Sequence, residues 1–265
     1  MLIDAHAHLD RYENVLGFAL SEIAEHRVFT IGNSMDILSY ERNLEIGEVC
    51  DLVLPTFGVH PRRAPQYADR LEDLAKHIRS SAMIGEIGLD FHWVKDPSEY
   101  TGQKRVFDYF LAAAREQNKT VNLHTKGAEQ EILDMLGAYE IEKAIIHWYS
   151  GPLDILKAMV NRGWHFTVGV EVMRSEHIRT IVRLVPVGQL LTETDNPGGQ
   201  KWLTGSLGMP GLILDVVREI SEIKKIHPEE LAQVIEENFA RLIRHDPYLT
   251  HVYDKFFSKL QNVNP

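Results

Sequence analysis

The first ten residues, MLIDAHAHLD, place an aspartate and two histidines at alternating positions, Asp4, His6 and His8. Residues two apart in a strand point to the same side, so a strand here would carry these three side chains on one face. Two imidazoles on a buried face are costly unless a partner satisfies them, and a metal ion is such a partner. The alternative is a pair of hydrogen-bonded histidines, because a transition-metal site needs several nitrogen or oxygen ligands at once.

Short apolar, β-rich runs alternate with amphipathic stretches along most of the chain, and these elements would position the polar residues. The strand candidates cover residues 2–9, 27–34, 51–60, 82–90, 120–125, 144–150, 165–171 and 189–195. Apolar residues at helical spacing predict helices that include residues 13–26, 68–80, 102–117, 128–140, 153–163, 176–185, 211–225 and 227–245. The alternation predicts an α/β fold, a (β/α)8 TIM barrel forming a single domain over residues 1–265, although a doubly wound open sheet has the same pattern. The last two helices and the tail ending LQNVNP predict a C-terminal helical extension.

Metal-capable side chains recur where these strand candidates end. The polar residues at the ends are His6, His8, Asn33, His60, Glu86, Asp90, His124, His147, Glu171 and Asp195. In a barrel the carboxyl ends of the strands meet at one mouth, so these groups would converge. Four imidazoles and two carboxylates packed together are difficult to stabilise without cations. The pattern therefore favours a metal centre over isolated structural histidines.

Composition and charge narrow the class of protein. The apolar content of 44% and charged content of 25% are ordinary for a globular chain with a sizeable core. A single cysteine, Cys50, allows no intramolecular disulfide. Without a signal peptide or a transmembrane-length run, we expect a cytoplasmic protein with no membrane association. The net charge of −10 argues against non-specific wrapping of nucleic acid, but bound divalent cations would still allow a nucleic-acid substrate.

Seven motifs together resemble one known family. They are DAHAHLD (Asp4–Asp10), GVHP (Gly58–Pro61), GEIGLDF (Gly85–Phe91), NLHTKGA (Asn122–Ala128), HWYSG (His147–Gly151), TETDNP (Thr192–Pro197) and ENFARLI (Glu237–Ile243). Their order and spacing resemble those of the TatD-like metal-dependent hydrolases, also called TatD-type deoxyribonucleases, of the amidohydrolase superfamily. GEIGLD and ETD-x-P are the most specific of these motifs.

The resemblance implies a centre with two divalent metal ions, which would be Mg, Mn or Zn. One ion would be held by His6, His8, Glu86 and Asp195, and the second by Glu86, His124 and His147. Glu86 would then bridge two cations roughly 3.5–4 Å apart, a spacing that suits in-line displacement at phosphorus. Asp195 would also take the proton from the attacking water, so Asp195 and Glu86 are the predicted catalytic residues.

Three residues are predicted to bind substrate. His60 in GVHP would face the same mouth. Lys126 stands where the family commonly has arginine, and a lysine binds phosphate as a point charge without the bidentate fork. Lys201 lies in NPGGQKWLTGSLGMP, which departs from the family pattern and which we expect to form a flexible loop. Trp148 would either stack on a base or fill space behind His147.

The leading interpretation is a divalent-metal-dependent phosphodiesterase, a 3′–5′ exodeoxyribonuclease that trims single-stranded DNA ends with Asp195 as general base. A confined barrel mouth and an acidic surface both favour a strand end over a long duplex. The first alternative is a metal-dependent ester or amide hydrolase, such as an aminoacyl-tRNA deacylase, with the same ligands. The second is a subunit of a nucleic-acid-processing assembly, which would have partner proteins in a DNA-processing pathway.

Overall fold

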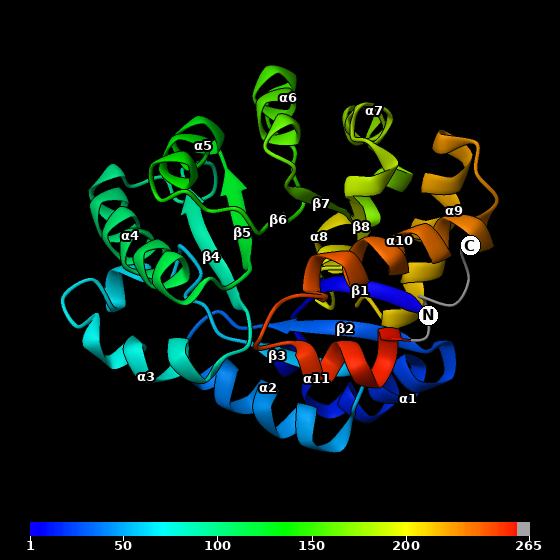
Figure 1. The fold of residues 1–265 in the computed structure, drawn as a ribbon, viewed down its shortest axis with the longest axis horizontal. Helices are drawn as coiled ribbons and strands as arrows, with labels where there is room; N and C mark the ends of the chain where they lie inside the picture. Colours follow the sequence, from blue (N-terminus) through cyan, green and yellow to red (C-terminus); the bar gives the residue numbers. More distant parts are fainter. Residues whose placement is uncertain (259–265) are drawn as a thin grey trace.

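Eight parallel strands form the centre of the molecule in the computed structural model, which describes residues 1–258 (Figure 1). The strands are β1 Leu2–Ala7, β2 Val28–Asn33, β3 Val53–Thr56, β4 Ile84–Asp90, β5 Val121–Lys126, β6 Ala144–Ile146, β7 His165–Val168 and β8 Leu190–Thr192. They pair in chain order as β1-β2-β3 and as β4-β5-β6-β7-β8. A bridge between Phe57 and Ile84 joins the two sheets at one seam, and Asp195 N donates to His6 O across 2.9 Å at the other. The predicted (β/α)8 TIM-barrel fold is therefore confirmed.

Helices surround the strands and connect them in sequence (Figure 1). They are α1 Leu16–His26, α2 Ile37–Val49, α3 Glu72–Ser80, α4 Tyr100–Gln117, α5 Glu129–Ala138, α6 Leu153–Asn161, α7 Glu176–Leu184, α8 Gly198–Thr204, α9 Ile213–Lys224, α10 Pro228–Ile243 and α11 Thr250–Val252. Short turns of 3₁₀ helix occupy η1 Leu9–Val15, η2 Ala64–Gln66, η3 Pro97–Glu99, η4 Val170–Met173, η5 Val187–Gln189 and η6 Pro210–Leu212, and η7 Tyr253–Phe257 is a π-helical turn. In the described residues 1–258, no helix is both long and apolar enough to cross a membrane.

Two segments differ from the sequence-based expectation. Helix α2 was not among the predicted helices; a capping box between Asp36 and Ser39 begins it, and its apolar face is short. The segment expected to be a flexible loop contains the short helix α8. Gly199 N donates to Asp195 O across 2.7 Å, and Gly205, with φ of +80°, ends the helix in the left-handed region. The segment therefore has defined structure directly beside the end of β8.

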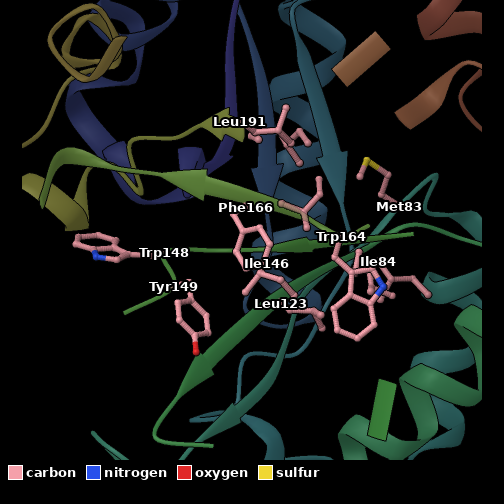
Figure 2. Packing of buried hydrophobic residues seen from close by; sticks show 14 of the residues in the cluster. Met83, Ile84, Leu123, Ile146, Trp148, Tyr149, Trp164, Phe166 and Leu191 are labelled. Carbon is pink, nitrogen blue, oxygen red and sulfur yellow. The ribbon is translucent and has the colours of Figure 1, made fainter. Parts of the chain in front are cut away.

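Buried apolar side chains from the strands and helices pack into one large core (Figure 2). Ile84, Leu123, Ile146, Phe166 and Leu191 come from five strands and are fully buried or nearly so. Strands covered on both faces lack the polar alternation of a half-exposed sheet, which explains the continuous apolar runs in the sequence. This packing fixes where each strand ends, and therefore where the polar residues at those ends lie.

Helices α9, α10 and α11 follow the eighth strand and confirm the predicted C-terminal helical segment. Helix α10 begins with Pro228 at its first turn, followed by Glu229 and Glu230. Proline needs no backbone donor there, and acidic residues favour the positive end of the helix dipole. The predicted tail LQNVNP lies outside the described residues.

Candidate metal centre

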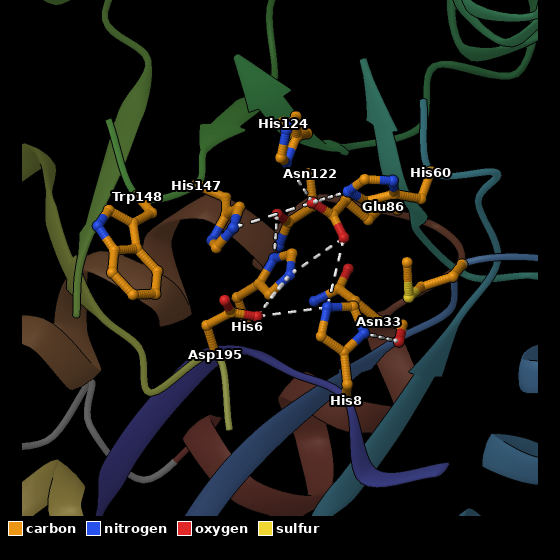
Figure 3. A network of polar contacts seen from close by, with 12 residues as sticks. His6, His8, Asn33, His60, Glu86, Asn122, His124, His147, Trp148 and Asp195 are labelled. Carbon is orange, nitrogen blue, oxygen red and sulfur yellow. Dashed lines mark hydrogen bonds and ion pairs between the residues drawn. The ribbon is translucent and has the colours of Figure 1, made fainter. Parts of the chain in front are cut away.

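The carboxyl ends of five strands bring six metal-capable side chains to one mouth of the barrel (Figure 3). These residues are His6 and His8 from β1 and its end, Glu86 from β4, His124 from β5, His147 after β6 and Asp195 after β8. The mouth is a cavity of about 770 Å³, and five of the six residues line it. The structure thus gathers all six residues predicted as ligands around one point.

Glu86 lies between the histidines, with one carboxylate oxygen toward each group (Figure 3). Its Oε2 is 3.5 Å from His6 Nε2 and 3.4 Å from His8 Nε2. Its Oε1 is 2.9 Å from His124 Nδ1 and 3.8 Å from His147 Nε2. A carboxylate placed in this way can contribute one oxygen to each of two cations.

Asp195 completes the side of the centre formed by His6 and His8. Its Oδ1 is 3.3 Å from His8 Nε2 and 3.9 Å from His6 Nε2. Burial would raise the pKa of this carboxyl, but a hydrogen bond from His8 and the positive potential of the histidines lower it to about 2. Its backbone φ of +50° is in the left-handed region, which aspartate tolerates better than most residues. Asp195 is therefore held as an ionised carboxylate at the rim of the centre.

Three of the histidines are oriented by acceptors on their outer nitrogen. His6 Nδ1 lies 2.9 Å from Asn122 Oδ1, and the Asn122 amide nitrogen donates to Ala5 O, which fixes the amide orientation. His8 Nδ1 lies 3.1 Å from the carbonyl oxygen of Asn33. A carbonyl oxygen can only accept, so in the neutral rings Nδ1 carries the hydrogen and Nε2 offers its lone pair to the centre.

His147 shows the same arrangement with a carboxylate, and His124 differs from the other three. His147 Nδ1 is 2.6 Å from Glu193 Oε2. His124 is turned the other way, with Nδ1 toward Glu86 and Nε2 3.3 Å from Asp90 Oδ2. Backbone N–H groups of His92 and Trp93 hold the other Asp90 oxygen. Histidine ligands of metals typically have their second nitrogen bound in this way, so the donor set fits cations at the inner nitrogens.

The histidines and carboxylates of the centre shift one another's pKa values. Burial opposes charge on His8, but the nearby carboxylates of Asp195 and Glu86 raise its pKa well above the usual 6.5. Burial likewise opposes charge on Glu86, yet the surrounding histidines hold its pKa well below the usual 4.5. Even so, His6 Nε2 and Glu86 Oε2 are buried without a hydrogen-bond partner. Unsatisfied buried polar atoms are costly, and a cation between them would remove that cost.

His60 also lies at the centre, with Nε2 3.7 Å from Glu86 Oε1 (Figure 3). The chain reaches this position because Gly58 has no side chain: a Cβ there would lie 2.3 Å from Glu86 O. Burial lowers the pKa of His60 to about 3, so the ring is neutral. The prediction that His60 faces the mouth agrees with this placement.

The two predicted lysines differ in position. Lys126 lines the cavity, but its Nζ already donates to Trp148 O across 2.6 Å and to Ser150 Oγ across 2.8 Å. Lys201 is exposed on α8 and is not among the residues that line the cavity. Neither placement assigns a substrate contact, and both lysines stay predictions.

Indole rings form part of the cavity rim. Trp202 on α8 is 57% exposed, and its ring centroid lies 5.8 Å from that of Trp93, which is 43% exposed. Trp148, behind His147, is buried, and its ring centroid is 6.0 Å from that of Trp202. Trp148 Nε1 donates to Glu171 Oε2, so this residue fills space and supports the rim. Trp93 and Trp202 are the rings with open surface.

The orienting residues Asn122 and Glu193 were not predicted as functional. Each stands two positions before a predicted ligand, His124 and Asp195 respectively. On a strand that spacing puts two side chains on one face, which is the signal that could have identified them. Asn33 was noted at a strand end, but its carbonyl rather than its side chain meets His8.

The mouth of the barrel fits a metal-dependent enzyme, and the comparisons with known proteins make it a metal-dependent hydrolase. A family model described as "TatD related DNase" matches residues 3–244, and the chain therefore belongs to that family. It is 30% identical over 264 residues to the metal-dependent hydrolase YabD of Bacillus subtilis, covering 92% of this chain and 99% of that protein. It is 25% identical over 273 residues to the deoxyribonuclease TATDN3 of Homo sapiens, covering 96% and 97% of the two chains.

Solved structures support the fold. YJJV, a TatD homologue from Escherichia coli, superposes with a TM-score of 0.83 at 24% identity, covering 91% of this chain and 97% of that one. A TatD family hydrolase from Entamoeba histolytica gives a TM-score of 0.78 at 18% identity, with 91% and 97% covered. At these identities the likeness concerns the barrel itself.

Proposed function

We propose that this hydrolase is a deoxyribonuclease that removes nucleotides from single-stranded DNA ends with two divalent cations. The observation that carries the proposal is the position of Glu86, whose two oxygens face separate histidine groups. His6, His8 and Asp195 would hold one cation with Glu86, and His124 and His147 the other. Family membership and the name of the human relative support DNA as the substrate class.

Two bridged cations would supply charge neutralisation at a phosphate and make water more acidic. The protein's own contribution begins with Asp195, the proposed general base, whose ionised carboxylate accepts the proton of the attacking water. Asn122, Glu193 and Asp90 hold the histidine rings in orientation throughout. Because these contacts exist before any ligand binds, little reorganisation accompanies the reaction.

The rim of the cavity supports single-stranded DNA as the substrate. Trp93 and Trp202 offer aromatic surface on which bases can stack irrespective of sequence. Arg11, Arg62 and Lys126 line the same cavity and provide local positive charge in a chain of net charge −10. We include Lys201 as an outer phosphate contact, and the 3′-to-5′ direction follows from the family resemblance alone.

A matched substrate panel tests the proposal. Metal-loaded protein is incubated with end-labelled single-stranded DNA, duplex DNA, RNA and an aminoacyl-tRNA, with Mg, Mn and Zn in turn and Asp195→Asn as control. We expect shortening of single-stranded DNA from its 3′ end, a slower reaction on duplex and loss of activity with chelator. Intact DNA together with hydrolysis of the aminoacyl ester would replace the nuclease function with an esterase function using the same ligands.

A further inference from the structure

One histidine of the centre has the opposite hydrogen-bond pattern from three others. His6, His8 and His147 each have the nitrogen remote from the centre in a hydrogen bond with an oxygen acceptor. His124 instead makes its hydrogen bond at the inner Nδ1, to Glu86 Oε1 across 2.9 Å. His60 instead accepts a hydrogen bond at Nδ1 from the backbone N–H of Arg62, across 3.1 Å. A nitrogen that accepts carries no hydrogen, so the neutral His60 ring has its hydrogen on Nε2, the atom facing Glu86.

We propose that His60 is not a metal ligand but a neutral N–H donor that binds an oxygen of the substrate's phosphate beside the metal centre. This assignment rests on the proposed function, because it takes a phosphate as the bound group. By distance alone, His60 belongs to a metal-capable group with Glu86 and His124. The direction of its hydrogen bond separates it from that group, since ligation at Nε2 would need a lone pair there.

The local backbone holds His60 in this state. Its N–H donates to Met35 O across 3.0 Å, and its carbonyl accepts from Arg63 N across 2.7 Å. The ring packs edge-on against His124, with centroids 4.6 Å apart. A ring flip that brought Nδ1 to the centre would give up the contact with Arg62 N and leave that donor unpaired. The tautomer is thus fixed by main-chain geometry.

Nε2–H has room for a ligand. It lies 3.7 Å from Glu86 Oε1, which is longer than a hydrogen bond, and His60 lines the cavity. A phosphate oxygen that entered the cavity beside Glu86 could accept a hydrogen bond from His60 Nε2–H. A neutral donor adds no positive charge next to bound cations, so it does not compete with them electrostatically.

The same geometry excludes proton transfer by His60. Nδ1 carries no hydrogen because it accepts from Arg62 N. If His60 also gave up its Nε2 hydrogen, the ring would become an imidazolate anion, which is far too basic to form by simple proton donation. The residue therefore stabilises charge through a hydrogen bond and transfers no proton. A neutral imidazole that polarises a substrate oxygen is an established type of enzyme group.

The test compares His60→Ala and His60→Gln with His124→Gln. Bound Mn or Zn is counted after dialysis, and affinity of the loaded protein for inorganic phosphate is measured by calorimetry. We expect wild-type metal content in both His60 variants and reduced content in His124→Gln. Phosphate affinity should fall about tenfold to 100-fold in His60→Ala, the range for a lost hydrogen bond to a charged group, and less in His60→Gln, whose amide can still donate.

Nitrogen NMR of histidine-labelled protein gives a readout independent of activity. His60 should show a hydrogen-bearing Nε2 both before and after cations are added, while the other four rings change at their inner nitrogens. Loss of metal in His60→Ala, or a metal-induced shift at His60 Nε2, would overturn the assignment by making His60 a ligand. Unchanged phosphate affinity in His60→Ala would overturn it as well. Neither measurement requires DNA cleavage, so failure of the nuclease function would be seen separately.

Discussion

The two ends of the barrel both bury charged groups, but they differ in whether those groups have hydrogen-bond or ion-pair partners. At the amino ends of the strands, which we call the floor, the Met1 amine lies 2.7 Å from Glu236 Oε2, and Lys143 Nζ lies 2.7 Å from Asp246 Oδ2. Lys119 Nζ donates to the carbonyl oxygens of Ile78 and Arg79, across 2.6 and 3.0 Å. These charged groups of the floor therefore have partners within the protein.

The mouth leaves polar atoms without hydrogen bonds. His6 Nε2 and Glu86 Oε2 are both buried there and lack one. Such features cost stability, and they persist where the surrounding structure enforces them, commonly at functional sites. The floor therefore stabilises the fold, whereas the mouth is arranged for a ligand.

The largest expected effect comes from Glu86→Ala, which removes the group shared by both halves of the mouth. We expect loss of bound cations and of their stabilising effect on the melting temperature. Metal stabilisation of transition-state charge is worth several kcal/mol, so turnover should fall by about 10³-fold or more. Metal content after dialysis, thermal melts with and without Mn, and hydrolysis rates check this. Retention of both cations would show that Glu86 is not the bridge.

Asp195→Asn should have the next largest effect on turnover. The amide keeps the shape and one oxygen, so much of the metal should be retained. Loss of a general base typically costs about 10²–10⁴-fold in rate. Parallel metal counting and rate measurement separate the two roles. Equal rates in the variant and the wild type would rule out Asp195 as the base and leave it as a ligand only.

The pattern of residues in the sequence was sufficient to predict the barrel and the six clustered side chains. Eight strands buried on both faces give long apolar runs, and the polar residue that ends each run is easy to recognise. His124 and His147 could be placed beside His6 because parallel strands deliver their carboxyl ends to one mouth.

What the sequence could not give was the direction of hydrogen bonds and the shape of the last loop. The contrast between His60 and the other histidines depends on which ring nitrogen meets Arg62 N, a matter of local backbone geometry. Helix α8 contains two adjacent glycines, residues that disfavour helix, and forms because Asn196 and Asp195 accept from its first N–H groups. Such contacts depend on tertiary position and not on pattern.

The response of the mouth to pH offers a further test. The pKa of His8 is raised well above 6.5, so the metal-free protein holds a proton where a cation would bind. That proton stabilises the metal-free fold below about pH 6.5, and the contribution disappears as pH rises through the raised value. Metal affinity should therefore rise with pH, by about tenfold per unit for each proton displaced. Thermal shifts with Mn at several pH values should increase in this direction; a flat profile would contradict it.

Trp202→Ala should weaken binding at the rim without reaching the metals. Base stacking on an aromatic side chain is worth about 1–3 kcal/mol, so affinity for a single-stranded oligonucleotide should fall roughly 5-fold to 150-fold. Quenching of tryptophan fluorescence by oligonucleotide measures this in protein that need not turn over. Metal content should match the wild type, and the exposed Leu207→Ala is a control near the same helix. Unchanged affinity would remove the rim from the substrate site.

The smallest expected effect on activity comes from Lys119→Met at the floor. This variant tests whether the floor affects only stability and leaves the mouth unchanged. Lys119 is 2% exposed, and its loss leaves the carbonyls of Ile78 and Arg79 at the end of α3 without donors. The free energy of unfolding should fall by about 1–3 kcal/mol, which for a chain of this size lowers the melting temperature by about 2–4 °C per kcal/mol. Turnover at temperatures where the fold is intact should equal the wild type, and Mn should raise the melting temperature by the same increment in both proteins. Lys76→Met on the exposed face of the same helix is the matched control and should change neither quantity. If Lys119→Met instead abolished the metal-dependent increment, the floor would be coupled to the mouth, and the division of the barrel into a stabilising end and a ligand-binding end would fail.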